Sequence, residues 1–295
     1  MQFTHPGGEH CPSKKELETG TFLWNYGPHR RKFLKATGQY VVNDSLSPKQ
    51  KLLFWGEWEP TSHFYPASRV EGNGVTPHFI HEPFLCLGNQ GLNLPPFKNE
   101  KNKERQNTDP FVFADNFLYC CCKQRKKMKG SNQTVYTQMG QLGKGSIVLF
   151  GSTISAKQGG PYFVLDTVFV VGDYLEYIDN QADTCLKTFV SKEYRDITGF
   201  ANWPGNRFTC YKGASFSEPV DGMFSFVPCR PYYSEDVGFP RVVLSSKEFD
   251  FLSDNLNAAP KYQRSYPLKQ CWNQICQTVK KQGFMLGVNF EYQYL

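Results

Sequence analysis

The sequence predicts an α+β protein built on a curved mixed sheet or a partly open β-barrel, with peripheral helices and long N-terminal loops. Three observations predict it. From Asp109 onward, short apolar runs alternate with Gly, Asp and Asn. Clear helical periodicity is strongest near the end of the chain, and strands and helices do not alternate as they do in a doubly wound sheet. We expect a loop-rich region over residues 1–108, packed on a β-rich core with a C-terminal helix over residues 109–295.

The first region contains few periodic stretches. Residues 28–36 predict a short helix, because Phe33 and Leu34 lie among basic residues and Gly38 can end it. Residues 51–58 (KLLFWGEW) predict a strand, and the polar residues 98–108 predict a flexible connection.

The second region predicts several short strands. The run at residues 161–173 is apolar on both faces, which is typical of a central strand. Further strands are expected at residues 110–122, 146–152, 224–227 and 241–244. Helices are expected at residues 191–196, 246–256 and 268–282, the last having apolar residues at helical spacing and Gly283 after it.

Composition limits the possible classes of protein. The 295 residues include 16% aromatics, which excludes a disordered chain, and no apolar run approaches the roughly 20 residues of a membrane-spanning helix. The first residues lack an apolar stretch behind a basic start, so we expect a cytoplasmic protein without membrane association. Lys and Arg exceed Asp and Glu by 33 to 27, giving a net charge of +6. This excess fits either an anionic partner or simple solubility.

The basic residues form two clusters, which indicate an anionic partner more strongly than the total charge does. One cluster is Arg30, Arg31, Lys32 and Lys35, and the other is Lys123, Arg125, Lys126, Lys127 and Lys129. A solvated loop is the alternative interpretation of the second cluster.

Motifs of several enzyme classes are missing. The sequence has no Walker loop, GxGxxG, GxSxG or HExxH motif, and no CxxC pair. His5, His10 and Cys11 could share a metal ion, but no second ligand pair accompanies them, so we expect neither a metal nor a cofactor.

The stretch FWGEWEP predicts a site for a nucleic-acid base. Trp55 and Trp58 would stack on the base while Glu57 accepts from its polar edge. Asn107 and Asp109 are candidate contacts to the same edge. Alternatively, both Trp residues belong to the core with Glu57 on a solvated edge, and Asn107 and Asp109 only stabilise a turn.

The start of the expected helix predicts a phosphate site. His29, Arg30, Arg31 and Lys32 would combine basic side chains with free backbone N–H groups. The alternative is a solvated basic helix face.

Titratable groups leave a catalytic role open. His5, Glu9 and His10 could form an acid–base pair, although a Gly-rich loop fixes no geometry for it. Asp166 lies in the apolar run FVLDTVFVV and therefore requires either a buried Arg partner or a position in a pocket.

Residues 140–173 carry a resemblance to a known family. Gly145, Ser146, Phe150 and Gly151, followed by the apolar residues 164–171, resemble the central turns and strands of the PUA-like superfamily. This superfamily includes EVE, ASCH and YTH domains and relatives associated with modified nucleotides. The resemblance implies a pocket that receives a single base, often modified, between aromatic side chains.

Three functional hypotheses follow. The preferred one is a nucleic-acid or nucleotide binding protein that recognises a base, modified or not, in an aromatic pocket, as in bacterial or phage systems that handle modified DNA. The second is an enzyme that acts on a nucleotide or a glycosidic bond, using a carboxylate such as Glu9, Glu57 or Asp109 with a His. The third is a protein interaction module.

Overall fold

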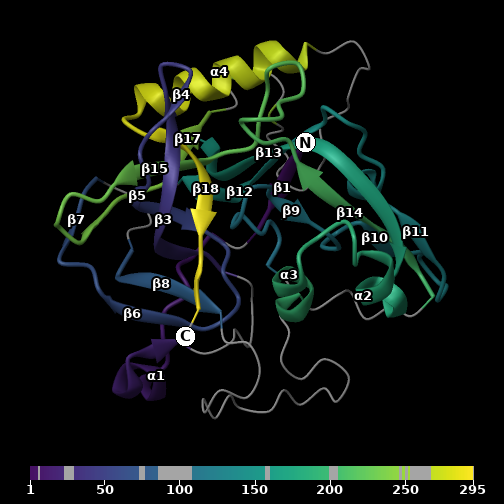
Figure 1. Cartoon of the computed structure of the whole chain (residues 1–295), viewed down its shortest axis with the longest axis horizontal. Coiled ribbons are helices and arrows are strands. Elements are labelled where there is room, and N and C mark those ends of the chain that lie inside the picture. Colours follow the sequence, from purple (N-terminus) through teal and green to yellow (C-terminus); the bar gives the residue numbers. More distant parts are fainter. Residues whose placement is uncertain are drawn as a thin grey trace.

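Figure 1 shows a computed structural model of the chain. It describes residues 1–5, 7–22, 30–72, 77–85, 108–156, 160–198, 205–245, 248–249, 252 and 267–294.

The larger sheet is mixed and curved. Its strand order is β18 (Met285–Glu291), β15 (Val227–Pro231), β5 (Gln50–Gly56), β3 (Lys32–Val42), β8 (Phe79–Leu85), β6 (Ser62–Pro66) and β2 (Thr21–Phe22). The short strands β4 (Ser45–Leu46) and β19 (Gln293–Tyr294) pair with β3 and β8. β8 runs parallel to β3, and β18 pairs with β3 as well as with β15, which curls the sheet.

The smaller sheet is organised around one long strand. Its order is β1 (Gln2–Thr4), β12 (Ile147–Ala156), β13 (Gly160–Ile178), β14 (Arg207–Gly213) and β9 (Leu118–Tyr119). β13 has 19 residues, and its first half pairs with β12 and with β17 (Val242–Leu244). Its second half pairs with β14 beyond a shift in register between Val171 and Asp173.

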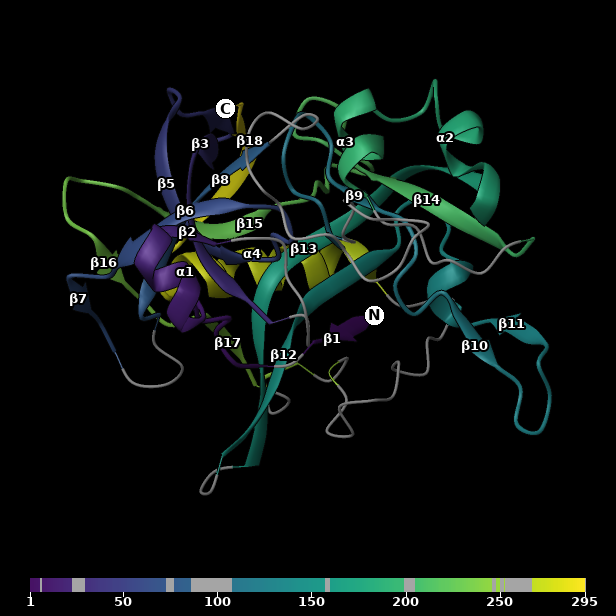
Figure 2. The ribbon, with the colours of Figure 1, turned by 90° about the horizontal axis from the view of Figure 1, so that it is seen from below.

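Two further strand pairs lie outside these sheets. They are β10 (Arg125–Lys127) with β11 (Thr134–Tyr136), and β7 (Arg69–Val70) with β16 (Val237–Gly238). Figure 2 shows the β10–β11 hairpin projecting from the body of the molecule, on the side opposite α1 (Lys14–Thr19).

The helices are peripheral. Besides α1 they are α2 (Ala182–Cys185), α3 (Lys192–Ile197), α4 (Leu268–Lys281) and the 3-10 turns η1 (Gln138–Gly140) and η2 (Asp179–Gln181). α4 packs one face inward through Trp272, Ile275 and Val279, which recur at helical spacing. No helix in the described ranges has both the length and the apolar composition needed to cross a bilayer.

Both hydrophobic clusters draw on both sheets. One contains Leu34 and Phe54 of the larger sheet with Phe169 of β13. The other contains their chain neighbours Phe33 and Trp55, together with Val168. Since neighbouring strand residues point to opposite faces, β3, β5 and β13 are each buried on both sides. Residues 1–108 and 109–295 therefore share their core, and strands of the two regions pair directly, as β5 does with β15.

Most of the expected elements are confirmed, but one helix is wrong, and of the strand expected at 224–227 only Val227 belongs to a strand, as the first residue of β15. The strands at 146–152 and 161–173 and the helices at 191–196 and 268–282 are present as β12, β13, α3 and α4. The helix expected over 28–36 is instead the start of β3, because Lys32–Gly38 pair with β5 and Phe33–Leu34 pair with β8. Of residues 110–122 only Leu118–Tyr119 form a strand, while the helix expected at 246–256 and the connection at 98–108 lie almost wholly outside the described residues.

Candidate functional site

The described residues predicted to hold a base lie in the interior. Trp55 is 2% exposed and donates its indole N–H to the Phe239 carbonyl at 2.7 Å. Trp58 is 1% exposed and donates to the Thr61 carbonyl at 2.8 Å. Both rings are therefore core residues with satisfied polar atoms, as the alternative interpretation had it. Glu57 does not lie on a solvated edge as that alternative supposed, because it is buried too.

Glu57 belongs to a buried ion network that joins both sheets. Arg31 bonds to Glu57 through Nη1 and to Asp166 through Nε, the latter at 2.7 Å. Asp166 also pairs with Nε of Arg241 at 3.1 Å, and His5 Nδ1 lies 3.4 Å from Glu57. The buried-Arg explanation of Asp166 is thus confirmed. Burial lowers the pKa of Arg31, but the Glu57 and Asp166 carboxylates more than offset this, so its pKa lies above the ordinary value.

The predicted phosphate site is not assembled as expected. Arg31 and Lys32 are 0% and 1% exposed, because β3 is an inner strand and not the start of a helix. Arg30 is exposed, and His29 lies outside the described residues. Of these side chains, only that of Arg30 is described on the surface.

A second group of buried titratable residues lies beside Lys32. Its ammonium donates to the Trp58 carbonyl, and burial lowers the pKa of Lys32 to about 8 against the attraction of Glu59. Burial and the Lys32 charge lower the pKa of His10 to about 4. Burial also lowers the pKa of His81 well below its ordinary value.

Asp109 organises the backbone around the cysteine triplet. Its carboxylate accepts the backbone N–H groups of Cys120, Cys121 and Cys122 at 3.0, 3.1 and 2.9 Å. Because these three bonds occupy the carboxylate, the contacts of Asp109 are structural. They differ from the turn contacts expected from the sequence, since their partners lie 11 to 13 residues away along the chain. Asn107 lies outside the described residues.

The second basic cluster, unlike the first, is on the surface. Residues 116–165 contain seven Lys and Arg and no Asp or Glu, whereas the rest of the chain has 26 Lys and Arg against 27 Asp and Glu. This acid-free segment therefore carries the entire positive excess. Within it, Lys126, Lys127 and Lys129 are exposed on the projecting β10–β11 hairpin.

Arg125 joins the two strands of the hairpin to each other and to β14. The Arg125 guanidinium donates to Thr134 Oγ1 at 2.9 Å across the hairpin and to the Arg207 carbonyl of β14 at 2.9 Å. It also lies 4.3 Å from the centre of the Tyr136 ring. Arg125 is therefore occupied by contacts within the protein, whereas the lysines beyond it are exposed.

A polar pocket of about 480 Å³ lies at the register shift between β13 and β14. Its lining residues are Asn116, Lys144, Gly172, Asp173, Tyr174, Lys212, Gly213, Ala214, Glu218, Pro219 and Val220. Lys144 and Lys212 supply cations, Asp173 and Glu218 supply carboxylates, and the Tyr174 ring is 49% exposed. We call this the Tyr174 pocket.

The Tyr174 pocket and the hairpin both contact strand β14. The centres of the Tyr211 and Tyr174 rings are 6.2 Å apart. The Tyr211 hydroxyl accepts the backbone N–H of Leu142 at 3.0 Å, and Leu142 lies two residues before Lys144. The Arg207 carbonyl accepts a hydrogen bond from Arg125, and the Arg207 side chain pairs with Glu176 at 3.6 Å. Glu176 lies two residues beyond Tyr174 on β13. Hairpin and pocket therefore both adjoin the β13–β14 pair, and we call the two together the basic face.

Sequence reasoning found only part of the basic face. The run at 123–129 was visible as a charge cluster, but Tyr174, Lys212 and Asn116 are brought to it by strand pairing. The absence of acidic residues between Asp115 and Asp166 was the available signal for the wider segment.

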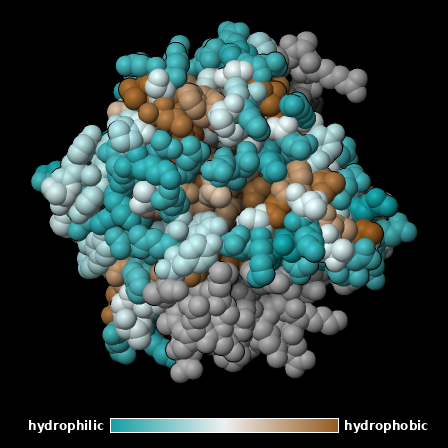
Figure 3. All heavy atoms as spheres, in the orientation of Figure 1, coloured by the Kyte–Doolittle hydropathy of each residue, from teal (hydrophilic) through white to brown (hydrophobic). Residues whose placement is uncertain are grey.

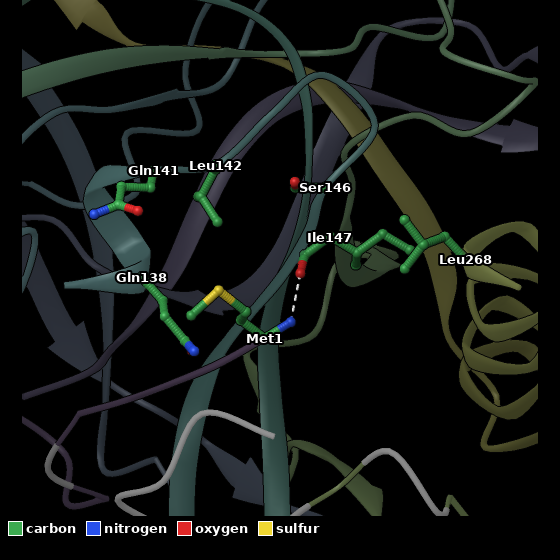
Figure 4. A pocket seen from close by; sticks show the side chains of 7 residues that line it. All are labelled: Met1, Gln138, Gln141, Leu142, Ser146, Ile147 and Leu268. Atoms are coloured by element: carbon green, nitrogen blue, oxygen red, sulfur yellow. Dashed lines mark hydrogen bonds between the residues drawn. The ribbon is translucent and has the colours of Figure 1, made fainter. Parts of the chain in front are cut away.

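Two other pockets are lined by residues of different chemistry. A pocket of about 270 Å³ is lined by uncharged side chains, among them Gln138, Leu142 and Leu268, and by Met1, whose amino group donates to the Ile147 carbonyl at 2.6 Å (Figure 4). A third, of about 400 Å³, contains Arg69, Arg230, Glu71 and Glu235, in which Arg69 pairs with both carboxylates. The face shown in Figure 3 is mainly hydrophilic around smaller apolar patches.

Comparison of the chain with protein-family models, with curated proteins and with solved structures finds no match.

Proposed function

We propose that this chain binds nucleic acid or a nucleotide through the basic face, with the hairpin lysines at phosphates and the Tyr174 pocket receiving a base. The observation that carries the proposal is the acid-free segment 116–165, which places Lys126, Lys127 and Lys129 on the projecting hairpin and Lys144 at the pocket rim.

The hairpin has the chemistry of a backbone contact. Lys126, Lys127 and Lys129 are exposed, and the surrounding sequence has no carboxylate to neutralise them. Lysines that replace condensed counterions on a phosphate chain gain affinity without reading the sequence. The Arg125 contacts hold this element in place, so little ordering is needed on binding.

The pocket has the chemistry of a base contact. A half-exposed Tyr174 ring offers a stacking surface, and Asp173 and Asn116 beside it can accept from or donate to a base edge. Lys144 at the rim suits a phosphate attached to that base. The aromatic element of the site is thus Tyr174 in place of the buried Trp55 and Trp58.

The resemblance to the PUA-like superfamily supports the same location. Residues 140–173, on which it rests, supply Lys144, Gly172 and Asp173 to the pocket. A modified base is the ligand that this resemblance implies.

The first experiment measures oligonucleotide binding by fluorescence anisotropy. The double variant Lys126→Glu/Lys127→Glu should weaken binding of single-stranded and duplex DNA by about 10-fold or more at low salt, because it removes two phosphate contacts and adds two repulsive charges. The matched control is Lys14→Glu/Lys15→Glu, which makes the same charge change on two exposed residues of α1, across the molecule (Figure 2). Equal affinity of the two variants would refute the proposed surface.

The second experiment tests the pocket. Stacking on an aromatic ring is worth about 1–3 kcal/mol per base, so Tyr174→Ala should weaken nucleotide or oligonucleotide binding by about 5- to 150-fold. Tyr233→Ala is the control, since Tyr233 is 77% exposed and lines a different pocket. Competition with oligonucleotides containing modified bases then tests base preference.

An enzyme acting on a nucleotide or a glycosidic bond is the second candidate, favoured by the buried titratable groups around Lys32. A lysine whose pKa is about 8 can exchange a proton near neutral pH, and Glu59 lies within electrostatic reach of it. Incubation with nucleotides, NAD and oligonucleotides, followed by chromatography, tests this function. Products that disappear in Lys32→Met, with oligonucleotide binding unchanged, would support it, and no products from the unaltered protein would reject it.

A further inference from the structure

Three side chains with metal-binding chemistry meet at a second surface point, distant in sequence from the basic face. Glu9 and Cys11 follow the Gly7–Gly8 turn, and Glu9 bridges to Arg31 at the start of β3. His78 lies one residue before β8. One ligand atom of each side chain lies within 4.8 Å of the other two.

Glu9 is the fixed member of this group. Its side chain is buried, and Oε1 accepts the backbone N–H groups of His78 and Phe79, both at 2.9 Å, while the same His78 N–H also lies 2.8 Å from Oε2. The other oxygen, Oε2, contacts both of the other side chains: His78 Nδ1 lies 2.6 Å from it and Cys11 Sγ lies 3.7 Å from it. A nitrogen and a sulfur therefore converge on one carboxylate oxygen, which the backbone holds in place.

This convergence resembles the ligand arrangement of a tetrahedral ion. With Zn–O and Zn–N bonds of about 2.0 Å and Zn–S of about 2.3 Å, tetrahedral geometry separates O from N by about 3.3 Å and O from S by about 3.5 Å. The sulfur already lies near that distance, and the His78 ring needs to move outward by only about 0.7 Å. The His78 side chain is 70% exposed and Cys11 is exposed, so both can adjust.

We propose that Glu9, Cys11 and His78 bind one Zn²⁺ ion, with the fourth position open to water. Imidazole, thiolate and carboxylate are the ligands that Zn²⁺ takes in proteins, and one thiolate with one carboxylate balances its charge. Binding releases the Cys11 thiol proton and leaves His78 Nδ1 without a proton, so the affinity rises with pH. Sequence spacing could not show this site, because β8 brings His78 to Cys11 from 67 residues away.

A second group of possible ligands provides an internal comparison. Asp109, Cys120 and Cys121 also place one ligand atom each within 4.8 Å of one another. All three are buried, and the Asp109 carboxylate already accepts three backbone N–H groups. We therefore assign the ion to the Cys11 group and use Cys120 as the control.

The experiment titrates chelator-treated full-length chain with Zn²⁺ against a chromophoric chelator, and with Co²⁺ while recording absorption. We expect one equivalent of Zn²⁺ and a thiolate-to-cobalt band. Cys11→Ser and His78→Ala should each weaken Zn²⁺ binding by about 100-fold, since loss even of an outer partner costs 10- to 100-fold, and Cys11→Ser should abolish the band. Both residues are exposed, so the variants are expected to fold.

Cys120→Ser should leave the stoichiometry and the cobalt band unchanged. The inference is overturned if the unaltered chain binds no Zn²⁺ at micromolar concentration. It is equally overturned if Cys11→Ser and His78→Ala retain the full affinity, or if the band disappears in Cys120→Ser and not in Cys11→Ser.

Discussion

At the scale of single residues, the interior is unusual in how many charges it contains. Arg31, Glu57, Asp166 and Arg241 are each at most 5% exposed and are paired with one another. Removing one partner of a buried pair leaves the other charge without compensation, which costs more than the pair itself contributes. The sequence showed that Asp166 needed a partner, but not which arginine would supply it, because Arg31 comes from another sheet.

We expect Asp166→Asn to lower the free energy of unfolding by about 3–5 kcal/mol, because Arg31 and Arg241 both lose their shared carboxylate. Urea denaturation measures this change. Glu176→Gln is the control, since the Glu176–Arg207 pair is exposed and should contribute less than about 1 kcal/mol. Equal effects of the two substitutions would contradict the network described above.

The pH dependence of stability should report on His10. Burial lowers its pKa to about 4 in the folded chain, whereas the pKa of a histidine in an unfolded chain is about 6.5. Between these values the unfolded chain binds more protons, so stability falls as the pH falls from about 6.5 to 4. His10→Gln should flatten this part of the stability curve, measured by urea denaturation at a series of pH values, and an unchanged slope would count against the assigned pKa.

At the scale of elements, sequence periodicity correctly predicted those elements whose structure depends mainly on neighbouring residues. α4 was predictable because its buried residues recur at helical spacing. Residues 28–36 were mistaken for a helix because the charges around Phe33 and Leu34 suggested an exposed face. Pairing with β5 and β8, which comes from residues up to 47 positions away, makes this segment a strand instead.

The packing of α4 gives a stability prediction. Ile275→Ala should cost about 2–5 kcal/mol, because Ile275 is 1% exposed in the cluster that joins α4 to both sheets. Gln274→Ala, one residue away on the exposed face, should change stability by less than about 0.5 kcal/mol. Thermal denaturation of both variants checks the prediction, which is wrong if Gln274→Ala is the more harmful.

At the scale of the whole molecule, the proposed function and the stability of the fold depend on different parts of the chain. The two sheets share their apolar clusters and the ion network. The residues buried in this shared interior include Trp55, Trp58, Glu57, Arg31 and Lys32. The charge excess, in contrast, is carried by the acid-free segment 116–165. Sequence reasoning could identify a charge run, but it could not tell a buried aromatic from an exposed one, since both FWGEWEP and the β13 sequence pair rings with carboxylates.

The most direct test of the proposed function is the salt dependence of oligonucleotide affinity. Each phosphate contact contributes about 0.7 to 0.9 to the slope of log affinity against log salt concentration. We predict a steep negative slope for the unaltered chain, reduced by about 1 to 2 in Lys126→Glu/Lys127→Glu and unchanged in Lys14→Glu/Lys15→Glu. A slope near zero, or one that both double variants lower equally, would contradict binding through the basic face.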